Sequence, residues 1–173
     1  MNKRTLKISM TAMIASVAIV LSYIEMIIPD IPYVLPGMKL GLSNIAIMFS
    51  LFVLDLPATL FICIIKSLFV LLMRGTVSFI MSLVGGLLSA IVMFLLIRVK
   101  KPTFGYIGIG ISGAFFHNLG QILVAFIITD STIFAYLPFL SLSSLVTGFL
   151  TSLVLYLVMP KVMKLKVFDV NNF

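Results

Sequence analysis

Long uninterrupted runs of apolar residues constrain this chain more than any other feature. The run from 77 to 97, VSFIMSLVGGLLSAIVMFLLI, contains no charged side chain and reaches the ~20 residues that a helix needs to cross a bilayer. Only 10% of all residues are charged, whereas about a quarter are charged in a typical soluble domain. Such a chain cannot cover itself with a solvated surface, so we expect an all-α integral membrane protein.

Six apolar segments are predicted to be transmembrane helices of one domain spanning 1–173. Backbone polar groups in lipid must be satisfied internally, which leaves helices or closed barrels, and the runs lack the period-two alternation of barrel strands. The predicted helices are 7–28, 40–54, 57–73, 77–97, 104–128 and 136–160. The second and third span only about 22–26 Å, so we expect them to be tilted, broken or surrounded by other helices.

The basic residues predict the orientation of the chain. Six crossings place one large group of them on the same side: Lys3, Arg4, Lys7, Arg98, Lys100, Lys101, Lys161, Lys164 and Lys166. The positive-inside rule makes this side cytoplasmic, so both termini are predicted to be cytoplasmic in a multi-pass protein of the bacterial cell membrane. The net charge of +7 is thereby explained without nucleic acid, whose recognition needs a basic face on a solvated fold.

Several polar side chains fall within or beside the predicted helices and are candidate ligand-binding residues. They are Lys39, Asn44, Lys66, Arg74, His117, Asn118 and Gln121. An ionisable residue inside a membrane costs about 2.5–3.5 kcal/mol on insertion scales and usually faces the interior of the bundle. Because these cations outnumber the nearby acids, a shared cavity open to the outside would suit an anionic or carbonyl-bearing ligand.

Structural roles remain open for the same residues. Lys39 and Arg74 are close enough to helix ends for their charged groups to reach the interface. His117 and Asn118 could link helices by hydrogen bonds, although the four-residue spacing of His117 and Gln121 puts that pair on one helix face. Lys66 is deeper and needs a wet cavity or a carboxylate, for which Glu25 is a candidate.

Small residues in the first predicted helix suggest a surface for helix packing. Thr11 and Ala15, and Ala12 and Ser16, are pairs of small residues four apart, a spacing that lets transmembrane helices approach closely. Ala12, Ala15 and Ser16 are therefore predicted to dock a membrane partner, with packing inside the bundle as the alternative.

The sequence lacks the side chains that catalysis or metal binding usually requires. It holds one histidine, one cysteine and five acids, and no two of the acids are close in sequence. We find no metal-ligand spacing and no phosphate-binding loop. We therefore predict no catalytic residue, no metal and no cofactor, and any uphill transport would need a partner or an ion gradient.

Three short motifs resemble one known family. The segments LPGMKLGLSNI, SLVGGLLS and HNLGQ resemble those of the Gx transporter family, also called heptaprenyl diphosphate synthase component I. The family pattern matches at Pro36, Gly37, Lys39, Gly41, Asn44, His117, Asn118, Gly120 and Gln121. The family is similar in size and layout to the S components of energy-coupling factor transporters, which implies an S-component-like bundle, a small vitamin- or precursor-like ligand, a transmembrane coupling subunit and cytosolic ATPases.

Two functions follow as expectations. The first is a substrate-binding membrane subunit for uptake, energised by partner ATPases. The alternative is a non-catalytic accessory subunit in isoprenoid or menaquinone metabolism, or in flavin- or quinone-linked electron export. A synthase itself would need clustered carboxylates to hold Mg²⁺ against a diphosphate, and the chain has no such cluster. A scaffold whose polar groups only join helices is the third interpretation.

Overall fold

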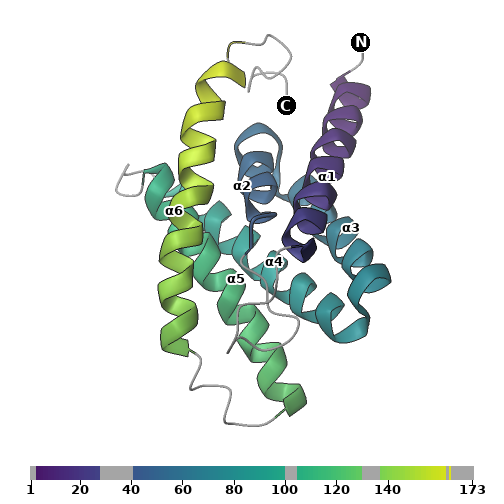
Figure 1. Ribbon diagram of the computed structural model, residues 1–173. Coiled ribbons are helices and arrows are strands. Elements are labelled where there is room, and N and C mark those ends of the chain that lie inside the picture. Colours follow the sequence, from purple (N-terminus) through teal and green to yellow (C-terminus); the bar gives the residue numbers. More distant parts are fainter. Residues whose placement is uncertain (1–2, 28–40, 100–104, 130–136, 163, 165–173) are drawn as a thin grey trace.

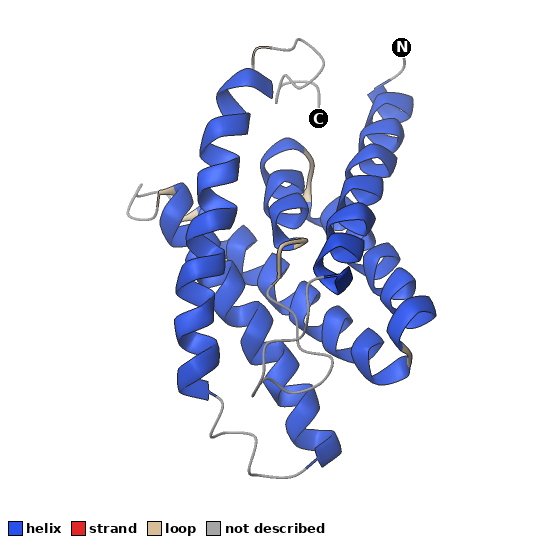
Figure 2. Ribbon diagram, viewed as in Figure 1, coloured by secondary structure: helices blue, strands red, loops and turns tan. Residues whose placement is uncertain are grey.

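The chain folds into a bundle of helices, as the sequence predicts (Figure 1). A computed structural model describes residues 3–27, 41–99, 105–129, 137–162 and 164. Figure 2 shows that every regular element among these residues is helical. The helices are α1 (Lys3–Ile27), α2 (Asn44–Val53), α3 (Leu56–Arg74), α4 (Thr76–Arg98), α5 (Tyr106–Thr129) and α6 (Leu137–Val162).

Five of these helices, all except α2, are long and apolar enough to cross a membrane, which fits a multi-pass membrane protein. The prediction that the second helix covers 40–54 is too long, because α2 has only 10 residues and a length of about 15 Å. The predicted third helix is slightly too short, because α3 has 19 residues. Asp55 caps its start by accepting a hydrogen bond from the Ala58 N–H, a typical arrangement for an orphan donor at a helix end.

The short helix α2 is enclosed by longer ones, which agrees with the expectation for a short apolar segment. It lies between α1 and α6 (Figure 1) and also contacts α3, α4 and α5. Its Ile47 and Met48 side chains are fully buried in the main hydrophobic core, together with Met93 and Leu155. The position of α2 therefore places the turn that precedes it, residues 41–43, inside the bundle.

Glycines allow α4 and α5 to pack with their backbones almost in contact. A Cβ atom on Gly120 would lie only 2.7 Å from the Cα of Gly85, and one on Gly85 would lie 2.7 Å from the carbonyl oxygen of His117. Small residues serve this purpose in membrane helices, where close van der Waals contact replaces the hydrophobic effect between helices. The crossing fixes the position of His117 on α5.

One ion pair ties α1 to the turn between α2 and α3. The Lys7 Nζ donates to the Asp55 Oδ2 over 2.5 Å. Burial alone would raise the pKa of Asp55, but the hydrogen bond and charge of Lys7, with the Ala58 N–H, hold that pKa below its usual value. This contact puts the start of α1 and the α2–α3 turn at the same end of the bundle, as the predicted orientation requires.

We predict a small, pH-dependent effect from this pair. Its stabilisation is present above the unfolded pKa of about 3.9 and is lost as the pH falls through the lower folded value. Because both side chains are more than a third exposed, screening limits the pair to about 0.5 kcal/mol. Asp55→Asn should lower thermal stability slightly at pH 7, and Asp55→Ala should lower it further because the helix cap is also lost. Equal stability of the two variants would contradict the assignment of a separate cap.

Candidate functional site

The turn before α2 is held by a carboxylate from the last turns of α1. The Glu25 Oε1 accepts hydrogen bonds from the backbone N–H groups of Gly41 and, over 3.3 Å, of Leu42. Gly41 has a φ of +86°, a left-handed conformation that glycine adopts at little cost. Glu25 is only 5% exposed, so a carboxyl group lies inside the bundle at this turn.

Lys66 brings a positive charge to the same turn from α3. Its Nζ donates to the Ser43 Oγ over 2.8 Å, and its side chain is 2% exposed. The carboxylate of Glu25 interacts electrostatically with this ammonium group. An ammonium group has three donors, so one hydroxyl does not exhaust its capacity for hydrogen bonds.

Asn44 and His117 both lie close to Gly41. A Cβ atom on Gly41 would be 3.0 Å from the Asn44 Nδ2 and 3.5 Å from the His117 Cδ2. Asn44 is 2% exposed, and neither its Nδ2 nor its Oδ1 has a hydrogen-bond partner among the described residues; the same holds for the Glu25 Oε2. Buried groups of this kind cost about 1–3 kcal/mol each when unpaired, so each needs an explanation, and a bound ligand or water is one.

His117 also contacts Gln121 on its own helix. The Gln121 Nε2 and the His117 Nε2 are 2.8 Å apart, which confirms the prediction that these two side chains share one face of α5. Both residues are almost fully buried. We call the residues that meet here the polar cluster: Glu25, Gly41, Ser43, Asn44, Lys66, His117 and Gln121.

Three of the predicted ligand-binding residues are not in the polar cluster. Lys39 lies outside the described residues. Arg74 donates to the backbone carbonyl of Met26 over 3.2 Å, so it ties the end of α3 to the end of α1. Asn118 donates to the Ser144 Oγ of α6 over 3.0 Å, which is the helix-linking role that the sequence also allowed.

The predicted docking residues of α1 are divided between two environments. Ala12 and Ser16 are exposed, and the Ser16 Oγ donates to the Ala12 carbonyl over 2.9 Å. Ala15 is buried in a small core cluster with Ala18 and Ala46. Partner docking remains a prediction, and of the three residues only Ala12 and Ser16 present a surface for it.

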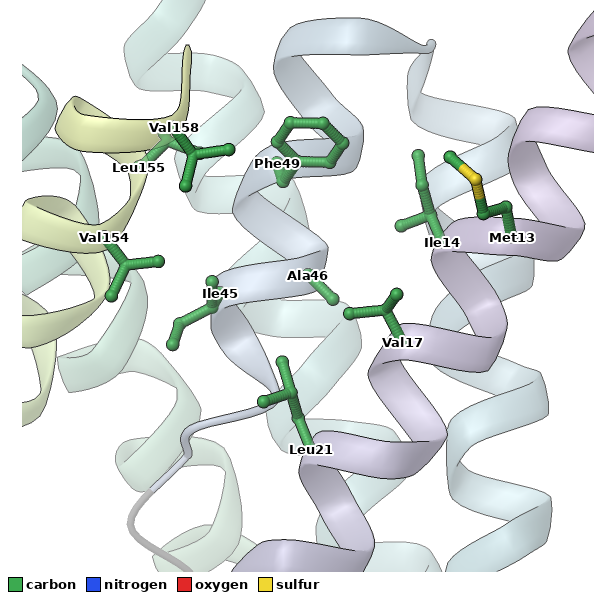
Figure 3. Close-up of a pocket in the computed structure, with 10 residues that line it drawn as sticks. All are labelled: Met13, Ile14, Val17, Leu21, Ile45, Ala46, Phe49, Val154, Leu155 and Val158. Carbon is green, nitrogen blue, oxygen red and sulfur yellow. The ribbon is translucent and has the colours of Figure 1, made fainter. Parts of the chain in front are cut away.

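A second feature is an apolar groove on the side of the bundle, between α1 and α6 with α2 as its floor (Figure 3). Its volume is about 440 Å³. The lining residues are all apolar: Met13, Ile14, Val17, Leu21, Ile45, Ala46, Phe49, Val154, Leu155 and Val158. We call this feature the lateral groove.

Sequence reasoning gave too little weight to two members of the polar cluster. Glu25 was expected only as a partner of Lys66, and Ser43 was not singled out. The signal for Glu25 was its place four residues after Leu21, on the inward face of an otherwise apolar helix.

No group of three His, Cys, Asp or Glu residues that could hold a metal occurs in the described part of the chain.

Comparison with known proteins gives one match. A family model described as heptaprenyl diphosphate synthase component I matches residues 14–158. These residues include α2 to α5 and the whole polar cluster. No match was found among curated proteins or among solved structures.

Proposed function

Since the chain belongs to the heptaprenyl diphosphate synthase component I family, we propose that it is a non-catalytic membrane subunit that works with a soluble polyprenyl diphosphate synthase. In this role it holds the growing or finished isoprenoid chain at the membrane while the partner carries out the chemistry. The match covers most of the chain, including both the polar cluster and most of the lateral groove. The proposal therefore concerns the bundle as a whole.

The lateral groove is the observation that carries the proposal. An isoprenoid chain is a branched hydrocarbon without hydrogen-bonding groups, and the lining of the groove is likewise entirely apolar. Burial of an apolar chain gains roughly 25 cal/mol per Å² when the chain leaves water. A chain that enters the groove from lipid gains none of this free energy, so its affinity depends on shape and packing. The groove is partly open to the outside of the bundle, which allows a chain to enter from the lipid.

Basic side chains stand near the end of the groove that faces the start of α1. Lys161 follows Val158 by about one turn of α6, and Arg4 precedes Met13 by about 13 Å along α1; both side chains are exposed. Cations of this kind attract a diphosphate. A polyprenyl diphosphate could thus place its chain in the groove and its head group at the predicted cytoplasmic surface, where a soluble synthase would release it.

The distribution of acids supports a non-catalytic role. Polyprenyl synthases hold Mg²⁺ with clustered carboxylates, the hard oxygen ligands that this ion prefers. In the described part of the chain the acids are Glu25 and Asp55. Asp55 bonds Lys7, about 27 Å along α1 from Glu25, so the two carboxylates cannot hold one ion.

Co-purification tests the proposed partnership. The tagged protein, extracted in mild detergent, should retain a soluble polyprenyl synthase from its own cells, and deletion of the protein should change the chain length of the products. Retention of no synthase together with unchanged products would exclude the accessory role.

The lateral groove gives a sharper prediction. Val17→Phe places a ring in the groove and should weaken the binding of geranylgeranyl diphosphate in lipid nanodiscs by about tenfold, or ~1.4 kcal/mol. Val20→Phe is the matched control, because Val20 is on the same helix, is similarly exposed (55% against 48%) and does not line the groove. Equal affinity of the two variants would show that the chain binds elsewhere.

The polar cluster favours a second candidate function, an S-component-like subunit that binds a small molecule for uptake. Buried charged residues in a membrane domain commonly mark a ligand pathway. An apolar isoprenoid chain cannot form hydrogen bonds with Glu25, Asn44 and Lys66. Co-purification with a transmembrane coupling subunit and ATPases would support this role, whereas retention of a synthase supports the first.

A further inference from the structure

We propose that the polar cluster is a binding site for a small uncharged molecule that carries a hydrogen-bond donor beside an acceptor, as amides, lactams and ureides do, and that it rejects diphosphates. This inference does not rest on the proposed function. The cluster and the lateral groove lie on different faces of α2, because Asn44 lies near His117 of α5 while Ile45 lines the groove.

The amide of Asn44 defines the hydrogen-bonding pattern. Its donor and its acceptor are both buried, and neither has a partner among the described residues. One amide edge on a ligand satisfies both atoms at once, because a donor and an acceptor then face their complements. A ligand that offers only acceptors leaves the Asn44 Oδ1 unpaired, at a cost of about 1–3 kcal/mol.

Glu25 and Lys66 extend this pattern. The Glu25 Oε2 is a second buried acceptor without a partner among the described residues, so the ligand should carry a further donor. Lys66 donates one described side-chain bond, to Ser43, and an ammonium group can donate more. The ligand that completes the cluster therefore has both donors and acceptors on a compact polar body.

The charges of the cluster exclude a diphosphate. Glu25 and Lys66 carry opposite formal charges within the same cluster, and both are at least 95% buried. A multiply charged anion would bring uncompensated negative charge next to Glu25 in a region of low dielectric constant, which is strongly unfavourable. An uncharged ligand leaves the balance of the pair unchanged.

Native mass spectrometry of the protein extracted from its own membranes tests this inference. We expect wild type to carry a neutral molecule whose fragments show an amide, lactam or ureide group, and Asn44→Leu to carry at least tenfold less of it. Ser89→Ala is the matched control, because it also removes a buried polar group without a described partner and should retain the ligand. Wild type that carries nothing, or carries a diphosphate, would overturn the inference.

Thermal unfolding provides the second measurement. Asn44→Leu breaks no described side-chain hydrogen bond, so it should unfold at or above the temperature of wild type stripped of its ligand. Added sodium pyrophosphate should leave the unfolding temperature of stripped wild type unchanged. Unfolding of Asn44→Leu at a clearly lower temperature would mean that the amide is paired within the protein. If pyrophosphate stabilised wild type but not Asn44→Leu, an anion would bind in the cluster. Either result would refute the proposal. Val17→Phe in the lateral groove should not affect these results, so this inference and the accessory role can fail separately.

Discussion

Gly85→Ala is expected to destabilise the bundle strongly, whereas the same change at the adjacent Gly86 is expected to be neutral or stabilising. A methyl group on Gly85 would lie 2.7 Å from the carbonyl oxygen of His117 and 3.0 Å from its Nδ1. The obstacle is a helix backbone and cannot rotate away, so α4 and α5 must separate. At Gly86 the nearest atoms, those of Cys63, are 3.7 Å away, which is ordinary contact.

The expected difference between the two variants is large for a single methyl group. Overpacking costs about 1–3 kcal/mol or more when the backbone must move, and alanine in place of glycine inside a helix gains up to about 1 kcal/mol. The helix-propensity gain is common to both variants and cancels, so their free energies of unfolding in mixed micelles should differ by roughly 1–3 kcal/mol. Similar values for Gly85→Ala and Gly86→Ala would contradict the close crossing of α4 and α5.

The effect should extend to ligand binding, because His117 sits at the same crossing. Movement of α5 displaces His117 from Gly41 and Asn44, and the polar cluster loses its shape. We therefore expect Gly85→Ala protein that still folds to carry less of the molecule bound by wild type, while Gly86→Ala retains it.

The sequence predicts the helices well and the turn before α2 poorly. The bilayer acts on every residue of a membrane span in the same way. Long apolar runs are therefore sufficient to find the helices from composition. The start of α2 depends instead on a distant residue. Glu25 binds the N–H groups of Gly41 and Leu42, and this contact between α1 and residues 41–42 has no local signature.

The candidate site shows the same division. Helical periodicity correctly puts His117 and Gln121 on one face of α5, and the cost of a buried charge correctly predicts that Lys66 faces the interior of the bundle. Neighbouring positions on a helix point about 100° apart, however, so Asn118 faces Ser144 of α6 and not the polar cluster. Depth in a span can be read from sequence, but the direction of each side chain depends on how the helices are packed.

Removal of one member of the Glu25 and Lys66 pair is expected to destabilise the protein more than removal of both. Both side chains are buried, and the carboxylate of Glu25 acts electrostatically on the ammonium group of Lys66. Removal of one of two opposite buried charges leaves the other uncompensated, which costs up to about 3 kcal/mol. Replacement of both charges by neutral groups removes this penalty.

The variants Glu25→Gln, Lys66→Met and their combination form a double-mutant cycle. Glu25→Gln keeps an oxygen that can accept from the Gly41 and Leu42 N–H groups, so it isolates the effect of charge. We expect each single variant to lose about 2–3 kcal/mol of unfolding free energy and the double variant to lose less than the sum by at least ~1 kcal/mol, a coupling typical of residues that interact. Strictly additive losses would show that the two charges do not interact. Lys66 would then be a cation able to attract a diphosphate, and the argument that the cluster rejects anions would fail.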